Sequence, residues 1–297
     1  MNELLDTAFT DWLEGDPSAS EDGCYRHRRL NERPELRPEI LYSLRSFVEK
    51  AHEDARRHLR EVAGISLDPL QQPPTHDPVA GYPALLHMNT LKEYFGEVLT
   101  GLICEHFAPH DEDEWRVPAY LFRFHVVAFQ ELERIRQTGQ AARTIPGRTG
   151  ADCLAFVRDS HGRIIRTLCC EAKCTADHQS GMVRKAHEQL SDPLLLPVDL
   201  PQIIEVLEDR GSPEASEWVE ALRQLWLDDP DDSYERCDLV SYTCGRRPVR
   251  KSSWIQADRP HTRYSGGRRL EAVEIHLDGV EGLIGQIYGR EIHVSAT

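Results

Sequence analysis

The chain has 297 residues and a formal net charge of −15, so it is long enough to bury a large core and too acidic to hold nucleic acid through its overall charge. Its eight cysteines are too few for a disulfide scaffold in a chain of this length. The first residues lack the basic and apolar regions of a secretory signal, and no apolar run approaches the length of a membrane span. We therefore expect a soluble, cytoplasmic protein without membrane contact.

The first 80 residues are predicted to form a helical extension. Apolar residues at helical spacing predict a short helix over residues 2–13 and a long amphipathic helix over residues 37–62. Between residues 64 and 82, repeated prolines disfavour both helix and central strand. We place a domain boundary there, with a second domain over residues 81–297.

A strong apolar stripe predicts a helix over residues 90–107, and one or two strands are expected over residues 115–129. Glu97 lies beside this stripe and follows Gly96, a residue that permits close approach of a neighbouring segment. Its carboxylate either points into a site at the flank of the helix or is an ordinary exposed helix glutamate. The sequence leaves both interpretations open.

The segment from residue 149 to residue 175 is predicted to be a β-hairpin. Two runs rich in apolar and β-branched residues, 152–158 and 164–173, flank a polar turn that ends in His161-Gly162. If the loop consists of these two residues alone, with glycine supplying the positive φ of such turns, the register of the two strands is fixed.

This register brings three charged side chains together. It places Asp152 directly opposite Glu171, and the alternation of strand side chains points Glu171 and Lys173 to the same face as Asp152. Carboxylate oxygens suit a hard cation such as Mg²⁺ or Mn²⁺, and a lysine beside them can orient the nucleophile, so the grouping indicates phosphodiester hydrolysis. The alternative is a surface hairpin with an ordinary cross-strand charge pair. The apolar runs beside both carboxylates favour the functional interpretation, because they predict burial.

Helices and strands alternate in the remainder of the chain. We expect a helix over residues 181–190, two more helices between residues 193 and 227, strands over residues 237–244 and 270–277, and a closing helix over residues 280–288. The whole pattern predicts an α/β fold with a mixed central sheet flanked by helices.

One segment opposes the overall negative charge. Residues 245–269 hold eight basic residues against one acidic residue, with Trp254 and Tyr264 between them. Such a segment is typical of phosphate contacts and base stacking, and the alternative is a solvated loop. The candidate nucleic-acid contacts are Arg246, Arg247, Arg250, Lys251, Arg268 and Arg269.

The order of these features resembles the αβββαβ core of the PD-(D/E)xK nuclease superfamily, which has a restriction-endonuclease-like fold. More narrowly, three short blocks resemble the DUF1837 family, the nuclease subunit of Hachiman-type anti-phage defence. These blocks are Gly96-Glu97, Gly150-Ala151-Asp152 and Cys170-Glu171-Ala172-Lys173. The resemblance covers roughly residues 89–245, and Ala151 stands where the superfamily motif has proline.

The resemblance implies a Mg²⁺-dependent DNA nuclease in anti-phage defence. Asp152 and Glu171 would be metal ligands, Lys173 would lie near the attacking water, and Glu97 would be an accessory metal ligand. Gln189, on the helix after Lys173, corresponds to a site glutamine of several superfamily members. The resemblance also implies a helicase partner that restrains the nuclease and delivers the DNA.

Three rival interpretations remain. Cys169, Cys170, Cys174 and His178 could form a zinc site, but adjacent strand cysteines point to opposite faces and no second C-x2-C pair is present. A Cys-His hydrolase is a second rival, although no nucleophile-elbow pattern precedes any cysteine. The strongest rival is a catalytically silent module of the same fold that binds DNA or assembles with a partner.

Overall fold

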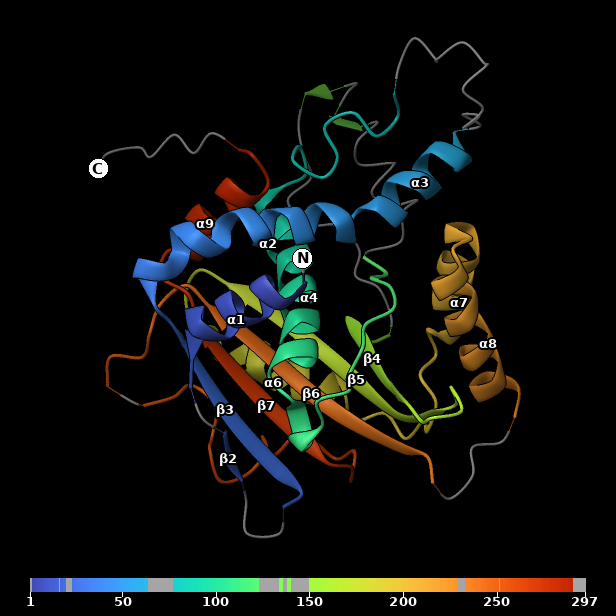
Figure 1. The fold of residues 1–297 in the computed structure, drawn as a ribbon. Coiled ribbons are helices and arrows are strands. Elements are labelled where there is room, and N and C mark those ends of the chain that lie inside the picture. Colours follow the sequence, from blue (N-terminus) through green and yellow to red (C-terminus); the bar gives the residue numbers. More distant parts are fainter. Residues whose placement is uncertain are drawn as a thin grey trace.

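The computed structural model describes residues 2–15, 17–19, 23–63, 77–122, 134–135, 138–139, 150–228, 233–250 and 252–290. Over these residues the chain is an α/β fold in which helices cover both faces of one curled, mixed sheet (Figure 1). The predicted α/β class, with a mixed sheet flanked by helices, is confirmed.

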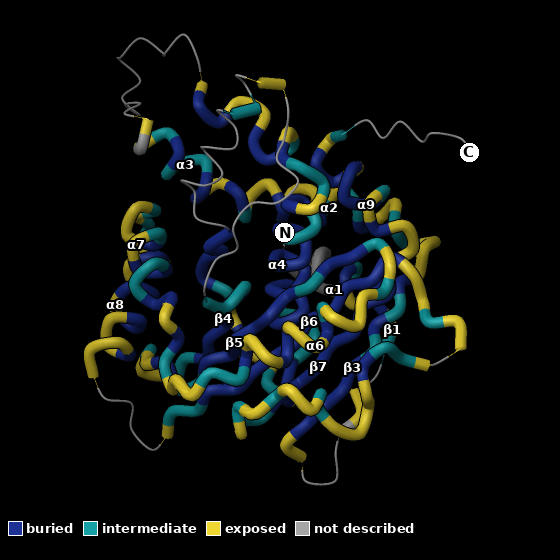
Figure 2. The backbone as a smooth tube through the Cα atoms, turned by 180° about the vertical axis from the view of Figure 1, so that it is seen from behind, coloured by how far each residue is buried: buried dark blue, intermediate teal, exposed yellow. Residues whose placement is uncertain are grey.

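Among the described residues the sheet has seven strands, six of them in the order β1-β3-β7-β6-β5-β4, and β2 pairs with β3. Strands β3, β7, β6 and β5 run parallel to one another, whereas β1, β2 and β4 are antiparallel to their neighbours. Figure 2 shows that the central strands are buried along most of their length. The strands are β1 (Leu13–Glu14), β2 (Pro17–Ala19), β3 (Tyr25–Glu32), β4 (Cys153–Arg158), β5 (Ile164–Thr175), β6 (Glu235–Cys244) and β7 (Leu270–His276).

Each face of the sheet has its own hydrophobic core. The first core lies under α1 (Asn2–Trp12), α2 (Arg37–Ala51), α3 (Glu53–Val62), α4 (Met88–His106) and α9 (Val280–Ile287). The second lies under α6 (Ser180–Gln189), α7 (Leu200–Arg210) and α8 (Pro213–Leu227). Two 3-10 helices, η1 (Pro34–Leu36) and η2 (Pro109–Asp111), join elements on the first side. None of the helices in the described part of the chain is long and apolar enough to cross a membrane.

The alternation of side chains along β5 decides which face each residue meets. Cys170 and Cys174 belong to the core under α4, whereas Cys169 belongs to the core under α6. Glu171 and Lys173 therefore lie on the α6 face of the sheet. The same alternation separates Cys169 from Cys170, as expected, and this argues against the zinc interpretation.

The first 80 residues are not purely helical, and this part of the prediction is corrected. Although α1, α2 and α3 are helices as expected, β3 is hydrogen-bonded in parallel to β7 along the sheet, so the sheet crosses the predicted boundary. The sequence of β3 is polar, and the strand can nevertheless be buried because its charged side chains are paired. Arg28 Nε donates to Glu271 Oε1 at 3.0 Å, and Arg26 Nε lies 3.5 Å from Glu271 Oε2. Paired charges can be buried where single ones cannot.

Of the one or two strands predicted over residues 115–129, the structure describes residues 115–122, which form an isolated bridge and not a strand, so this part of the prediction is wrong. Arg116 and Phe156 of β4 exchange backbone hydrogen bonds of 3.0 and 2.9 Å. The rest of that prediction lies outside the described residues.

Candidate active site

The hairpin of β4 and β5 has the predicted register at the end that carries Asp152 and Glu171. Cys153 pairs with Cys170, and the Asp152 N–H donates a hydrogen bond to the Cys170 carbonyl at 2.9 Å. Asp152 therefore lies beside Glu171, as the sequence predicts.

The turn at the other end of the hairpin differs from the prediction. The Gly162 N–H donates to the Asp159 carbonyl at 3.0 Å, and the Asp159 N–H donates to the Arg163 carbonyl at 2.8 Å, so the loop has one residue more than expected. The pairing then shifts at Val157, where β5 carries one extra residue. Because the two insertions offset each other, the register at Asp152 equals that of a two-residue loop.

Asp152, Glu171 and Lys173 meet on the α6 face of the sheet. Lys173 Nζ contacts Glu171 Oε1 and lies 3.4 Å from Asp152 Oδ2. It also donates to the Ala172 carbonyl at 3.2 Å, and the Ala172 N–H donates to Asp152 Oδ2 at 2.9 Å. The convergence of the three side chains is confirmed, whereas their catalytic roles stay predictions.

Burial and charge set the protonation of this cluster. Glu171 is 1% exposed, and burial together with the charge of Asp152, opposed by Lys173, raises the pKa of Glu171 to about 8. The pKa of Lys173 is raised as well: burial lowers it, but Asp152 and Glu171 together outweigh that effect. Because the cluster holds two carboxylates and one ammonium and is largely shielded from solvent, it favours a further positive charge.

A hard divalent cation fits this donor set. Asp152 and Glu171 offer carboxylate oxygens from neighbouring strands, and oxygen ligands are those that Mg²⁺ prefers. Glu171 is buried, but the Asp152 side chain is 23% exposed and remains open to solvent. A cation there would relieve the repulsion that raises the pKa of Glu171. Asp152 and Glu171 are therefore the residues that would hold it.

Glu97 lies on α4, which packs on the other face of the sheet. A Cβ on Gly96 would lie 3.2 Å from the Cys174 Cβ and 3.9 Å from the Ala172 Cβ, so glycine permits close packing of helix and strand. Glu97 is buried, and its charge, after burial and Tyr94, contributes to the raised pKa of Tyr288. Its role as an accessory metal ligand stays a prediction.

A cavity of about 300 Å³ lies beside Glu171, which is one of the residues that line it. Gln189, the last residue of α6, also lines this cavity. The structure thus places the predicted site glutamine in one cavity with a candidate metal ligand, on the face opposite to α4.

Asp199 supports the site and was not predicted. An aspartate immediately before a helix is typical of an N-cap, but the Asp199 side chain does not cap α7. It instead accepts a hydrogen bond from the Ala151 N–H at 2.9 Å. A Cβ on Gly150, which has φ +123, would lie 2.2 Å from Asp199 Oδ1. Asp199 therefore fixes the turn that leads into Asp152.

Three of the six basic residues predicted to contact nucleic acid are exposed, and a fourth lies outside the described residues. Arg246 is 76% exposed and pairs with Asp177 at 2.8 Å. Arg247 is half-exposed and donates to the Glu32 carbonyl at 2.7 Å. Arg250 is exposed, and Lys251 lies outside the described residues.

The other two, Arg268 and Arg269, are partly buried and make contacts within the protein. Arg268 donates to Asp238 Oδ2 at 3.0 Å and to the Leu190 and Asp192 carbonyls at 2.7 and 2.8 Å. Arg269 donates to the His110 carbonyl at 3.1 Å and faces Glu235 at 3.5 Å.

The aromatic residues of the same segment are engaged as well. Trp254 stacks on His178 with 3.9 Å between ring centroids, and the Tyr264 hydroxyl donates to Asp238 at 2.8 Å. Arg268, Trp254 and Tyr264 thus tie this segment to the sheet. Of the predicted nucleic-acid contacts, Arg246, Arg247 and Arg250 keep the exposure that such a contact requires.

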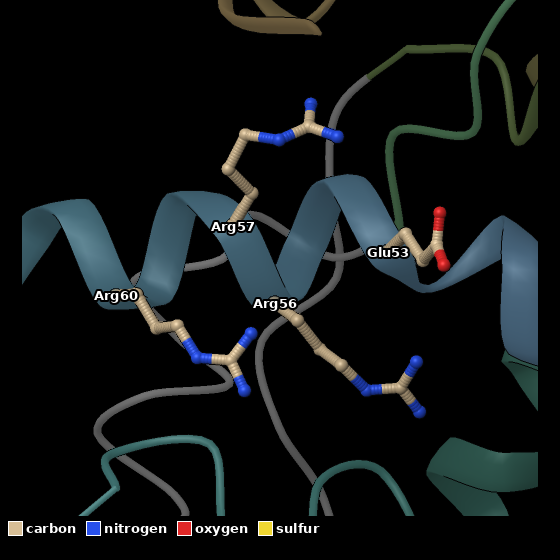
Figure 3. A pocket seen from close by; sticks show the side chains of 4 residues that line it. All are labelled: Glu53, Arg56, Arg57 and Arg60. Carbon is tan, nitrogen blue, oxygen red and sulfur yellow. The ribbon is translucent and has the colours of Figure 1, made fainter. Parts of the chain in front are cut away.

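A second hollow, of about 280 Å³, lies along α3 and is distant in sequence from the hairpin (Figure 3). The described residues that line it are Glu53, Arg56, Arg57 and Arg60. Each of the three arginines pairs with a carboxylate, at distances of 2.6 to 3.0 Å. Figure 3 shows Arg57 on the side of the helix opposite to Arg56 and Arg60, so the three do not converge on one anion.

One group of possible metal ligands lies away from the hairpin. His58 and Glu61 of α3 and Asp209 of α7 have ligand atoms within 4.8 Å of one another. Glu61 and Asp209 are exposed, and exposed acidic groups often gather without binding an ion.

Comparison with known proteins gives no family for this chain. No protein-family model matches the sequence, and no curated protein matches it. The class of the protein therefore rests on its α/β fold and on the meeting of Asp152, Glu171 and Lys173.

Proposed function

We propose that this chain is a metal-dependent nuclease that hydrolyses phosphodiester bonds in DNA. The observation that carries the proposal is the convergence of Asp152, Glu171 and Lys173 across β4 and β5. Two carboxylates suit a divalent cation, and a lysine beside them suits a phosphate oxygen or an attacking water.

We also propose that the fold is the restriction-endonuclease-like core of the PD-(D/E)xK superfamily. The order α4, β4, β5, α6, β6 supports it, with β4 and β5 antiparallel and β5 and β6 parallel. In the described residues the first of the three consecutive strands of that core is represented by the single bridge of Arg116 to Phe156. The helices α4 and α6 lie on opposite faces of the sheet, and the connection from the parallel strand β5 to β6 runs through α6, α7 and α8. Membership of the DUF1837 family, within a Hachiman-type defence system, is a finer proposal supported by the three short sequence blocks.

In this proposal each residue has a separate task. Asp152 and Glu171 would hold Mg²⁺ or Mn²⁺, which would stabilise charge on the phosphate and lower the pKa of a water. Lys173 is held in place by Asp152, Glu171 and the Ala172 carbonyl, and its ammonium orients the attacking water. The Asp199 carboxylate keeps the turn before Asp152 fixed, so that the Asp152 carboxylate is in position for the metal before substrate binds.

The overall charge supports a partner that delivers the substrate. At −15, the chain repels DNA at long range, which slows encounter and weakens nonspecific binding. A helicase subunit that presents DNA to the site would overcome this barrier. Arg246, Arg247 and Arg250 are the described candidates for contact with the DNA backbone.

The second candidate function is a silent DNA-binding or assembly module. The observation that favours it is the internal pairing of Lys173, whose ammonium contacts both carboxylates and so forms an ion-pair cluster complete without substrate.

Incubation of plasmid DNA with Mg²⁺ or Mn²⁺ separates the two functions. The nuclease should cut the plasmid, lose activity with EDTA, and lose it in Lys173→Ala. Lys185→Ala, a matched change of an exposed lysine on α6, should cut like the parent. Intact plasmid in every lane, with the helicase partner present, would favour the silent module.

A further inference from the structure

We propose that the cavity beside Glu171 receives a nucleobase of the substrate strand, so that the protein acts on unpaired nucleotides. The inference rests on the proposed nuclease function and adds to it the class of substrate. It is carried by the charge, the size and the apolar rim of the cavity, and by its continuity with the carboxylate cluster.

The charge of the cavity excludes a phosphate and suits a base. Among the described lining residues, Glu171, Asp192 and Asp199 are carboxylates and Arg236 is the basic residue. Arg236 is already occupied, because its guanidinium donates to both oxygens of Asp192 at 2.9 and 2.7 Å. A phosphate would meet net negative charge, whereas a base is neutral and its amino groups can donate to carboxylate or amide oxygens. Gln189 supplies such an amide at the wall of the cavity.

The size of the cavity fits one base and little more. Cavities that hold small molecules range from about 300 to 1,000 Å³. At about 300 Å³, this one lies at the lower limit of that range. A planar base can enter such a space, whereas a section of duplex cannot.

Apolar side chains at the rim supply the stacking surface. Leu194 is 45% exposed and Val198 is 53% exposed, and both line the cavity. Bases stack on apolar and aromatic side chains whatever their sequence. The exposed side chains of Leu194 and Val198 therefore form an apolar surface on which a base can stack.

The loop that carries this rim is held before substrate binds. Arg236 donates to the Leu194 carbonyl, and Arg268 donates to the Leu190 and Asp192 carbonyls. Both arginines also pair with the buried Asp238, at 3.4 and 3.0 Å. A wall fixed in this way need not be ordered by the ligand, which lowers the cost of binding.

Glu171 joins the cavity to the chemistry. Its carboxylate belongs both to the cluster with Asp152 and Lys173 and to the cavity wall. A base in the cavity therefore brings its own phosphodiester to the cluster. A base inside a duplex cannot do so, because its pairing edge is occupied and it is stacked on both sides.

The test uses Leu194→Asp, with Leu195→Asp as its matched control. The two leucines are neighbours with similar exposure, 45% and 51%, but Leu195 does not line the cavity. Labelled single strands with normal bases, the same strands with abasic sites, and the perfect duplex are cleaved in Mn²⁺. The parent and Leu195→Asp should cut the normal strand about 10-fold faster than the duplex or the abasic strand. Leu194→Asp should lose most of that preference.

Equal cleavage of normal and abasic strands by the parent would overturn the inference, and so would equal behaviour of the two leucine variants. Binding of a 2-aminopurine single strand in EDTA gives a readout that needs no cleavage. Fluorescence should change with the parent and Leu195→Asp but not with Leu194→Asp. If the parent cuts nothing, the nuclease proposal fails, and this binding result alone supports or overturns the base-binding cavity.

Discussion

Replacing Gly150 by alanine tests how firmly the turn before Asp152 is held. Gly150 has φ +123, a conformation that L side chains rarely adopt, and the strain costs about 1–3 kcal/mol. The new Cβ would lie 2.2 Å from Asp199 Oδ1, so the carboxylate has to move. Its movement breaks the hydrogen bond from the Ala151 N–H, which is worth about 1.5–3 kcal/mol because the acceptor is charged. The free energy of unfolding should therefore fall by about 2.5–6 kcal/mol.

Urea unfolding measures the loss of stability, and DNA cleavage below the melting temperature measures the effect on the site. We expect the folded Gly150→Ala variant to lose most of its cleavage activity because Asp152 is displaced. Gly162→Ala is the matched control. Gly162 also has positive φ, +82, but nothing lies within 4 Å of its Cβ position. It should cost about 1–2 kcal/mol and leave cleavage unchanged. If Gly150→Ala costs no more than Gly162→Ala, or cuts DNA at the parent rate, the reasoning is refuted.

Three further changes have distinct expected results. Glu171→Ala should abolish cleavage with an unchanged circular dichroism spectrum, because it removes one of the two proposed metal ligands; a parent-like rate would contradict the proposed site. Arg250→Glu should lower by about 1 the slope of the logarithm of the DNA-binding constant against the logarithm of the salt concentration. Arg268→Glu should instead lower the free energy of unfolding by about 3 kcal/mol, because buried Asp238 loses its closest cation. Burial lowers the pKa of His187 to about 4, so the folded state keeps it neutral and stability falls as the pH drops from about 6.5 to 4, by about 3 kcal/mol in all. His187→Leu should remove that part of the pH dependence in urea titrations at pH 7 and pH 4.5.

The hairpin could be predicted from the sequence because its signals are local. Apolar runs, a polar turn and strand alternation are enough to bring Asp152 to Glu171. The register was right although the turn was not, because the extra residue in the loop and the extra residue in β5 offset each other. Such compensation has no signature in the sequence. Only the side-chain periodicity constrains it, since a slip of one residue would have turned Glu171 to the other face.

The parts that were missed depend on partners far along the chain. The polar strand β3 resembles a solvated connection until Glu271 is seen beside Arg26 and Arg28. Likewise Arg268 resembles a phosphate contact until the buried Asp238 is seen beside it. Composition reports the charge of a segment but not the charge that faces it, so buried ion pairs are the features that a single sequence conceals best.

The pairing of β3 with β7 has a consequence for how the protein is made. Tyr25 aligns with Leu270, so β3, which is synthesised early, can pair with β7 only after nearly the whole chain has been made. In contrast, β4 and β5 are joined by a short turn and can pair as soon as both have been synthesised. Closure of a loop that long is slow compared with hairpin formation. The folding rate of this protein should accordingly be governed by the distant pairing, with the hairpin of β4 and β5 formed first and the far side of the sheet completed afterwards.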